Sequence, residues 1–563
     1  MFPTCVPVSC LQAGLPRLAI TTMPLIGSLK RAWDTCDGRV VLTSLFIFFS
    51  SSTVFIAKLL EIYAKQPGGW WFAASAIAVF AIATVLFFLL ICHGRAARWI
   101  LAFFLLASSQ AGYYMAQYGV VIDTDMLENA MQTNPAEFWG LVTPSLVIRT
   151  LLLGVLPAWL VLRSRCRPLG LWRQLKLRLF LIGGSLAVVA LLFAPLTASY
   201  ASFIREHKQV RMYASPLYFT YSVARYANER WFPKAPLPHK TLAADLREVG
   251  GQSSNELIIL VVGETARADR FALNGYARET NPELRRQDVV SFTRVTSCGT
   301  STAVSVPCMF SALGRAHYSA EEAKRTDNVL DVLVRGGVRV LWRDNNSDSK
   351  GVADRIRFEN FRSPERNRVC DPECRDVGML DGLDEFIREN NGHDILIVLH
   401  QMGSHGPEYY KRYPAAFEKF KPVCKTGELQ TCSKAEIDNA YDNTILYTDH
   451  FLSRVIDYLK KYDGSHQTAM LYVSDHGESL GENNMYLHGA PFAFAPDAQI
   501  RVPVVLWFGK NFDYPLDAAA RYRDHPLSHD DLFCSLLVGF DRETSLCERQ
   551  KPIFSARKDM KPR

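Results

Sequence analysis

Two short apolar runs in this chain of 563 residues are each followed at once by side chains that could bind a metal ion. The first run precedes Glu264, and the second precedes Asp475 and His476. Carboxylate and imidazole groups, joined by the hydroxyl of Thr302 as a fourth ligand, suit Zn²⁺. We therefore predict a zinc site built from these four residues.

The loop between Cys298 and Cys308 is rich in hydroxyl side chains. A threonine hydroxyl is a weak nucleophile at neutral pH, but metal coordination lowers the pKa of a bound hydroxyl as it does that of a bound water. The loop could thus supply a metal-activated nucleophile without a dedicated strong base. Spacing alone does not choose among the candidates, which are Thr300, Ser301, Thr302 and Ser305.

Three further histidines lie in loops flanked by glycine, where an imidazole ring can approach a bound ligand: His400, His405 and His488. Each could donate a proton, stabilise an oxyanion or bind a second metal ion, and each could instead be a structural histidine. Lys350, in a polar loop, could contact a phosphate oxygen or could simply be solvated.

The elements that position these residues lie in the second half of the chain, where apolar β-rich runs alternate with helical candidates. The runs are 257–262, 338–342, 395–400, 470–474 and 502–508. Continuous apolar strands that alternate with helices predict an α/β domain with a mainly parallel sheet covered on both faces. Binding sites in such sheets form beyond the carboxyl ends of the strands, where four of these runs end in the polar candidates.

The first half of the chain is predicted to be embedded in a membrane. Five apolar stretches have the length of about 20 residues that a helix needs to cross the hydrocarbon core. They are 40–61, 70–92, 99–118, 140–162 and 179–199. Basic residues gather before the first span and in every second connection, whereas the connection 119–139 is acidic. The positive-inside rule then puts the N-terminus in the cytoplasm and everything after residue 200 outside it.

The pattern divides the chain into four parts: a cytoplasmic segment 1–39, a five-helix transmembrane domain 40–199, an interfacial linker 200–250 and a soluble domain 251–563. The linker carries aromatic and basic residues at helical intervals, which favours a position along the outer leaflet over that of a plain solvated connector. The net charge of +7 requires no nucleic-acid partner, because much of the excess lies in the cytoplasmic connections.

Eight cysteines follow residue 290 and fall into closely spaced pairs. In a segment outside the cytoplasm, such pairs predict local disulfides. A cysteine-rich zinc site is the alternative, but the spacings lack a CxxC pair. The predicted disulfides are Cys298–Cys308, Cys370–Cys374, Cys424–Cys432 and Cys534–Cys547.

Five stretches carry a resemblance to a known family: GETARADRFALNGYARETNP, SCGTSTAVSVPCMFS, WRDNNSDSKG, HQMGSHGP and YVSDHGESLGEN. They resemble the lipid A phosphoethanolamine transferases, a group that includes the mobile colistin-resistance enzymes. The resemblance covers the five-span topology and nearly all of 250–510. It implies a catalytic domain of the alkaline-phosphatase and sulfatase type, and it selects Thr302 as the nucleophile.

The resemblance also implies roles for particular residues. The implied metal ligands are Glu264, Thr302, Asp475 and His476. The implied catalytic and substrate-contacting residues are Asn346, Ser347, Lys350, His405 and His488. In the acidic connection, Asn129, Thr133 and Glu137 match the residues that contact the lipid headgroup, and their spacing would put them on one helical face if Pro135 did not interrupt it.

By this resemblance the protein is a monomeric zinc enzyme of the bacterial inner membrane, with its catalytic domain in the periplasm. It would transfer phosphoethanolamine from phosphatidylethanolamine to a lipid A phosphate through a phosphothreonine intermediate, with one zinc ion at rest and a second during turnover as an open alternative. The lower negative surface charge would give polymyxin resistance.

Two other functions stay open at this point. One is a related transferase or hydrolase of the alkaline phosphatase superfamily that acts on core sugars, glucans or phosphoglycerol. The other is a non-catalytic membrane sensor with an inactive transferase domain. A sulfatase would need a CxPxR-type motif, which the hydroxyl-rich loop lacks.

Overall fold

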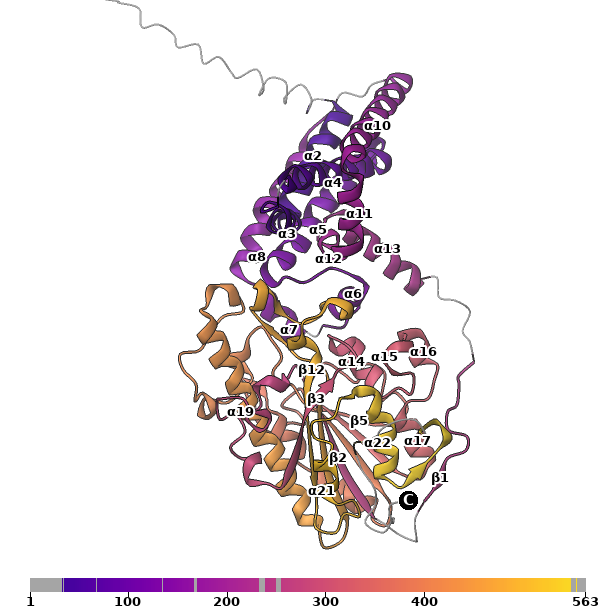
Figure 1. Ribbon diagram of the computed structural model, residues 1–563, viewed down its shortest axis with the longest axis vertical. Helices are drawn as coiled ribbons and strands as arrows, with labels where there is room; N and C mark the ends of the chain where they lie inside the picture. The colour runs from indigo at the N-terminus through magenta and orange to yellow at the C-terminus, as the bar shows by residue number, and fades with distance from the viewer. Residues whose placement is uncertain are drawn as a thin grey trace, which may run out of the picture.

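The computed structural model of the protein describes residues 33, 35–66, 68–133, 135–166, 170–231, 238–249, 255–547 and 553. Figure 1 shows an elongated molecule with a helical half at one end and a half built around a sheet at the other. The predicted fold class, a helical transmembrane domain joined to an α/β domain, is confirmed.

The helical half consists of long apolar helices. Within the described residues, four helical segments are long and apolar enough to cross a membrane, and a bent pair makes a fifth span if it is counted as one. The bent pair is α2 (Cys36–Ser51) and α3 (Thr53–Tyr63), and the other spans are α4 (Gly69–Ile91), α5 (Ala97–Tyr118), the run from α8 (Pro144–Arg149) to α9 (Leu156–Arg163), and α10 (Leu171–Phe193).

The bend between α2 and α3 measures 64°. Three consecutive serines occupy this point, and serine hydroxyls compete with the helical hydrogen-bond pattern. The Ser52 hydroxyl donates to the carbonyl oxygen of Ser215 at 2.6 Å, and the Ser51 hydroxyl donates to that of Ile47 at 2.6 Å. The first predicted span is therefore a broken helix.

A buried ion pair joins the helices at the predicted cytoplasmic end. Nε of Arg178 on α10 donates to Oδ1 of Asp37 on α2 at 2.8 Å, and both side chains are buried. The same guanidinium donates to the carbonyl oxygens of Leu89 and Cys92 at 3.0 and 2.6 Å. Arg178 thus satisfies both a buried carboxylate and the end of α4.

The described cysteines form five disulfides. Four are the pairs that the spacing predicted: Cys298–Cys308, Cys370–Cys374, Cys424–Cys432 and Cys534–Cys547. The fifth, Cys36–Cys166, joins the start of α2 to the connection before α10. Its 130-residue separation hides this pair from any argument based on local spacing.

Short helices lie between the two halves of the molecule (Figure 1). The acidic connection after α5 folds into α6 (Thr124–Gln132) and α7 (Pro135–Leu141). The segment after α10 forms α11 (Thr197–Glu206), α12 (Lys208–Met212) and α13 (Leu217–Trp231). The chain then reaches β1 (Arg247–Glu248), which pairs with β14 (Arg542–Glu543) near the C-terminal end of the fold.

The second half is built around an eight-stranded sheet. Its order is β13 (Leu527–Ser528), β3 (Val289–Thr296), β12 (Arg501–Phe508), β9 (Gln467–Ser474), β2 (Glu256–Gly263), β8 (Ile395–His400), β4 (Arg339–Asp344) and β5 (Arg357–Asn360). β12 runs antiparallel to both of its neighbours, and every other pairing in the sheet is parallel.

Successive side chains of the central strand enter two separate cores, because strand side chains alternate between the faces of a sheet. Ile258 and Leu260 pack under α14 (Thr302–Met309), α17 (Val329–Arg335) and α22 (Leu532–Gly539). Leu257 and Ile259 pack under α18 (Leu383–Glu389) and α19 (Lys434–Leu459). Both faces of the sheet are therefore covered, as the apolar runs predicted.

An apolar cluster joins the membrane half to the catalytic half. Tyr486 and Leu487 belong to a small hairpin of β10 (Ser479–Leu480) and β11 (Tyr486–Leu487). They pack with Tyr118 and Val120, which lie at the end of α5 and just beyond it. The hairpin therefore has one side against the membrane half.

A second contact comes from residues 424–432, which we call the docking loop and which the Cys424–Cys432 disulfide closes. The side-chain amide of Gln430 donates to the carbonyl oxygen of Ala116 at 3.1 Å. Glu428 Oε1 accepts from the backbone N–H of Ser145, at the start of α8, at 3.2 Å. The loop thus holds the ends of two membrane helices.

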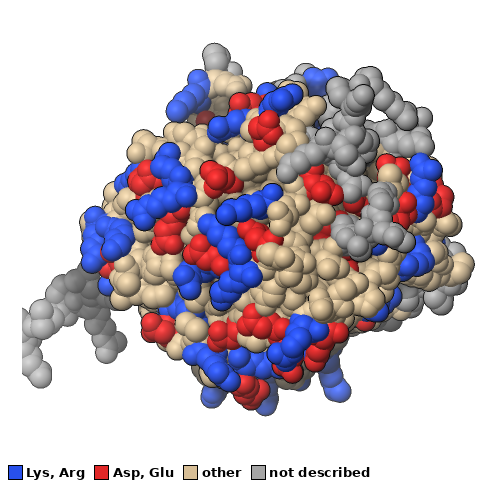
Figure 2. Space-filling view, turned by 90° about the horizontal axis from the view of Figure 1, so that it is seen from below, with Lys and Arg blue, Asp and Glu red and all other residues tan. Residues whose placement is uncertain are grey.

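The opposite end of the molecule faces away from the membrane helices. Figure 2 shows that basic and acidic side chains are interspersed over this face. Such mixing is typical of a surface that faces solvent.

We predict that Arg178→Met destabilises the protein by about 3–5 kcal/mol, because it leaves Asp37 as an uncompensated buried charge. The free energy of unfolding in a detergent titration measures this. Arg173→Met, an exposed site on the same helix, should change it by less than about 0.5 kcal/mol. Adding Asp37→Leu to Arg178→Met should recover part of the loss; equal losses for both arginine variants would contradict the role of the ion pair.

Candidate active site

Two neighbouring parallel strands end side by side at the candidate site. β2 and β9 pair with Gly263 opposite Ser474, so the next residues, Glu264 and Asp475, leave the sheet at the same edge. The loop after β8 passes close by: a Cβ atom at Gly403 would lie 2.8 Å from the backbone oxygen of Glu264, and its φ of 52° is left-handed. Glycine meets both requirements, which keeps Glu264 in place.

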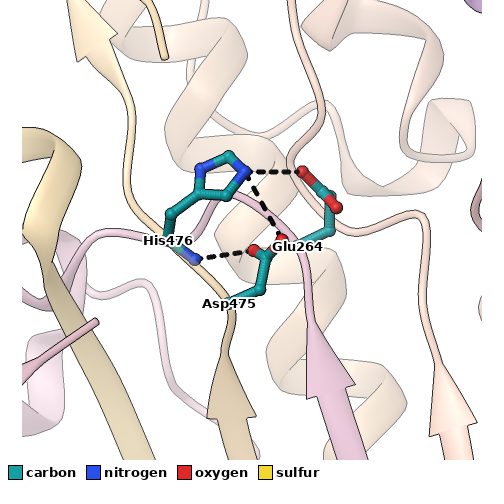
Figure 3. Close-up of side chains that lie close together, drawn as sticks. All are labelled: Glu264, Asp475 and His476. Atoms are coloured by element: carbon teal, nitrogen blue, oxygen red, sulfur yellow. Dashed lines mark hydrogen bonds and ion pairs between the residues drawn. The ribbon is translucent and has the colours of Figure 1, made fainter. Parts of the chain in front are cut away.

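Glu264, Asp475 and His476 form a compact and fully buried triad (Figure 3). Nε2 of His476 lies 3.5 Å from Oε1 of Glu264 and 3.4 Å from Oδ2 of Asp475. One donor atom from each residue lies within 4.8 Å of the others. The sequence prediction that these three side chains meet is thus matched by the geometry.

The charges of the triad suit a divalent cation. Burial raises the pKa of Asp475 well above its usual range, and the negative charge of Glu264 raises it further. Burial and the neighbouring His488 lower the pKa of His476 to about 3, so this ring is neutral. Its Nδ1 lies 2.9 Å from the carbonyl oxygen of Gly477, and a proton on Nδ1 leaves the lone pair at Nε2 for a ligand.

One oxygen of the triad has no protein partner. Within the described residues, Asp475 Oδ2 is buried and accepts no hydrogen bond. A buried polar atom left in this way is costly unless an ion or a water completes it. Two buried carboxylates and one neutral imidazole therefore fit a metal such as Zn²⁺.

Thr302 is the hydroxyl residue that faces the triad. It begins α14, and its Oγ1 lies 3.1 Å from Glu264 Oε2 and 3.4 Å from His476 Nε2. The competing hydroxyls of Thr300 and Ser305 donate instead to the backbone oxygens of Ala490 and Asp475. Of these three hydroxyls, that of Thr302 lies next to the triad. The N-terminus of α14 also favours an anionic group at this position.

Two of the predicted histidines lie beside the triad. The ring centroids of His476 and His488 are 4.5 Å apart, and those of His405 and His488 are 5.5 Å apart. Nδ1 of His488 lies 3.3 Å from Oε1 of Glu478, a buried carboxyl whose pKa burial raises. His405 Nδ1 lies 2.7 Å from the carbonyl oxygen of Gly406. A contact at Nδ1 thus orients each of these two rings beside the buried triad.

Comparison with known proteins identifies the family. Residues 79–231 match the model of the family described as phosphoethanolamine transferase EptA/EptB, and residues 256–539 match the sulfatase model. The chain is 43% identical to phosphatidylethanolamine transferase Mcr-2 of Escherichia coli, over 89% of this chain and 94% of that protein. The chain belongs to the phosphoethanolamine transferase family.

Other members of the family agree. The chain is 40% identical to phosphoethanolamine transferase EptA of Escherichia coli K12, over 77% of this chain and 81% of that one. The structure of the integral membrane lipooligosaccharide phosphoethanolamine transferase A of Neisseria meningitidis superposes with a TM-score of 0.86, at 34% identity over 92% of this chain and 97% of that one. The present chain is thus an integral membrane protein with a C-terminal periplasmic domain, as predicted.

The structure places the remaining predicted residues at different distances from the triad. Asn346 contacts the triad directly. Its Nδ2 donates to Glu264 Oε2 at 2.7 Å and to the backbone oxygen of Gln401 at 2.9 Å. Lys350 Nζ donates to the backbone oxygen of Ser347 at 2.9 Å, in the loop that follows β4. The Nδ1 atom of His400, whose role the sequence left undecided, lies 2.8 Å from Asp344 Oδ2, and both side chains are buried.

The predicted headgroup residues lie on the membrane side of this site. Asn129 is on α6, which packs against α14, and the Thr133 hydroxyl donates to the Asn129 carbonyl oxygen at 3.0 Å. Among the described residues, the Asn129 side chain makes no hydrogen bond to the triad. The side chain of Glu137 lies outside the described residues.

Sequence reasoning missed three contributors. Glu478 lies in the same Asp-His-Gly-Glu motif as the ligands, so its place in the motif was the available signal. His529 accepts from the Cys298 N–H at 3.1 Å and donates to the Ser474 oxygen at 3.0 Å, thereby bridging the nucleophile loop and β9. Met126 of α6 touches Gly489, next to His488. Neither His529 nor Met126 stands in a recognisable pattern.

We predict opposite effects of Asp475→Asn with and without metal. In metal-free protein the substitution removes repulsion from Glu264, so it should leave stability unchanged or raise it by about 1 kcal/mol. In Zn²⁺-loaded protein it removes a ligand and should lower both stability and bound metal. Thermal unfolding with and without a chelator, together with elemental analysis, measures both effects. The exposed Asp457→Asn is the control; destabilisation by Asp475→Asn that is equal in both states would contradict a metal site here.

Proposed function

We propose that the chain transfers phosphoethanolamine from phosphatidylethanolamine to a phosphate of lipid A. The observation that carries this proposal is the Thr302 hydroxyl, held 3.1 Å from Glu264 beside a buried triad of metal-ligand types. A family of transferases supplies the reaction class, and the position of Thr302 supplies the atom that would carry the transferred group.

Glu264, Asp475, His476 and the Thr302 hydroxyl would together hold one Zn²⁺. When bound, the ion would lower the pKa of the hydroxyl and polarise the phosphoryl oxygens. Asn346 orients the Glu264 carboxylate through its amide, which donates both to that carboxylate and to a backbone oxygen. Each ligand is thus fixed by a further partner, which limits reorganisation during the reaction.

The reaction has two halves that mirror each other. Thr302 Oγ1 attacks the phosphorus of the donor, its new P–O bond replaces the bond to diacylglycerol, and the threonine keeps the phosphoethanolamine as an ester. A lipid A phosphate oxygen then attacks the same phosphorus and restores the Thr302 hydroxyl. Holding both groups in one site supplies the proximity that such displacements need.

His488 is the candidate acid for the diacylglycerol oxygen that leaves in the first half. Its Nδ1 faces Glu478, so its Nε2 is the nitrogen available to the reacting group. His405 lies beside it and could stabilise phosphoryl oxygens, and Lys350 could reach the same group from the loop after β4. Asn129, Thr133 and Glu137 would contact the lipid headgroup from the membrane side.

We propose the same division of the chain that the sequence predicted, with boundaries at residues 39, 199 and 250, and a monomeric enzyme. Both substrates are lipids, and tethering the catalytic half to their membrane raises their effective concentration. Because the transferred group is zwitterionic, its addition lowers the negative charge of the cell surface. Weaker binding of cationic polymyxins follows.

We predict that Thr302→Ala abolishes the phosphoethanolamine increment on lipid A, because the Thr302 hydroxyl lies 3.1 Å from Glu264 Oε2, whereas those of Thr300 and Ser305 donate to backbone oxygens. Mass spectrometry of lipid A from Gram-negative cells that express either protein measures the increment. The rate of transfer should fall by at least about 10³-fold.

Ser301→Ala is the matched control. It removes the adjacent hydroxyl, which makes no capping hydrogen bond to α14, so the increment should persist. Transfer that survives in Thr302→Ala would exclude Thr302 as nucleophile. If wild type bound zinc and still added nothing to lipid A, the acceptor would instead be a core sugar, a glucan or another envelope lipid.

We predict that His488→Ala lowers kcat by about 10²–10⁴-fold with little change in KM, because a general acid acts in the transition state. Glu478→Gln should lower kcat less, since it weakens only the orientation of the ring. Steady-state kinetics with a phospholipid donor of varied leaving group measures both. A donor with a good leaving group should restore kcat in His488→Ala, because its departure needs no proton. A loss of kcat that is the same for every leaving group would argue against His488 as a general acid.

A further inference from the structure

The outer part of the membrane half contains an arginine at the meeting point of a broken helix and a distorted one. Arg149 ends α8, and the next residues, Thr150–Val155, form a π-helix. Its Nη2 donates to the carbonyl oxygen of Ser50 at 3.1 Å, next to the bend between α2 and α3. π-helical turns often mark functional sites.

Arg149 has few protein partners for a charged group in a membrane. Among the described residues, its only hydrogen bond is the one to Ser50, and no carboxylate forms an ion pair with it. Its Nε is buried and has no hydrogen-bond partner in the same set of residues. By contrast, Arg178 at the other end of the bundle pairs with Asp37.

The surroundings of Arg149 are shaped to admit it. A Cβ atom at Gly112 on α5 would lie 3.2 Å from Arg149 Nη2 and 2.9 Å from the Cα atom of Ser51, so glycine makes the space for the guanidinium. Gln110 donates to the Thr150 hydroxyl on the following turn. Arg149 thus lies in a polar setting among helices that carry exposed apolar side chains.

Arg149 lies close to the end of the membrane half that meets the docking loop. Thr143 caps α8 at the edge facing the catalytic half, and Glu428 of the docking loop contacts the adjacent Ser145. Arg149 lies six residues after Thr143, which is about 9 Å along a helix axis. An intramembrane charge without a protein counter-ion is a functional site by default, and its usual partner is an anion.

We propose that Arg149 is a binding site for the phosphate of a lipid in the outer leaflet. The guanidinium group suits two phosphate oxygens, and the two Nη groups of Arg149 make one hydrogen bond, to Ser50, among the described residues. The phosphate could belong to the phosphodiester of the donor or to a phosphomonoester of lipid A. The identity of these two candidates rests on the proposed function; the phosphate site itself does not.

Lipid binding without turnover tests the site. Full-length protein carrying Thr302→Ala, with and without Arg149→Gln, is titrated in detergent with dioleoylphosphatidylethanolamine, with lipid A and with dioleoylglycerol, which has no phosphate. Native mass spectrometry gives the dissociation constant of each. We expect Arg149→Gln to raise the dissociation constant of at least one phosphate lipid by tenfold or more and to leave that of dioleoylglycerol unchanged.

Weaker binding of phosphatidylethanolamine alone would assign the site to the donor, and weaker binding of lipid A alone would assign it to the acceptor. Unchanged binding of both phosphate lipids, or an equal loss of dioleoylglycerol, would overturn the proposal. Arg163→Gln, at the far end of the same span, is the matched control and should bind like the parent.

Arg149→Lys keeps the positive charge and guards against a folding defect. It should bind the phosphate lipid more tightly than Arg149→Gln and less tightly than the parent, because lysine keeps the charge and lacks the guanidinium fork. Gel filtration of each variant checks its folding. Because no transfer occurs in this background, a failure of the transferase mechanism would leave the binding result unchanged.

Discussion

The parallel register of β2 and β9 is the constraint on which the rest of the structure depends. It places Glu264 and Asp475 next to each other at the end of the sheet, where both are fully buried. Two carboxylates in a buried site repel each other and lack solvation, which raises the pKa of Asp475 and favours a compensating proton or cation. The loops around the triad hold these carboxylates in position. Gly403 allows the close approach of its loop to Glu264, and Asn346 orients the Glu264 carboxylate. The start of α14 brings the Thr302 hydroxyl to the same carboxylate.

The membrane half completes the site rather than only anchoring it. The hairpin of β10 and β11 packs against Tyr118 on one side and is followed directly by His488 on the other. α6 from the acidic connection packs against α14, and its Met126 touches Gly489. His488 and Thr302 are thus surrounded by two parts of the chain that are far apart in sequence.

The polar groups inside the membrane half fall into two kinds. Arg178 is saturated by Asp37 and by backbone oxygens, which makes it a structural tie between helices. Arg149 makes one hydrogen bond, to Ser50, among the described residues and lies next to a broken helix, where a lipid phosphate can pair with its guanidinium group. Both residues carry the same charge, and only their neighbours separate a structural role from a binding role.

The sequence by itself determined the five apolar spans, their orientation, the alternation of strands and helices, and the ligand types that follow β2 and β9, because hydropathy, charge asymmetry and strand-end chemistry are local properties. Local spacing also identified four disulfides. Only the tertiary structure decided that Thr302 rather than Thr300 or Ser305 faces the triad, that His400 pairs with Asp344, that Cys36 meets Cys166, and that His529 braces the nucleophile loop. Each of these depends on contacts between residues distant in the chain, and such contacts are set by sheet order and helix packing, which no local pattern encodes.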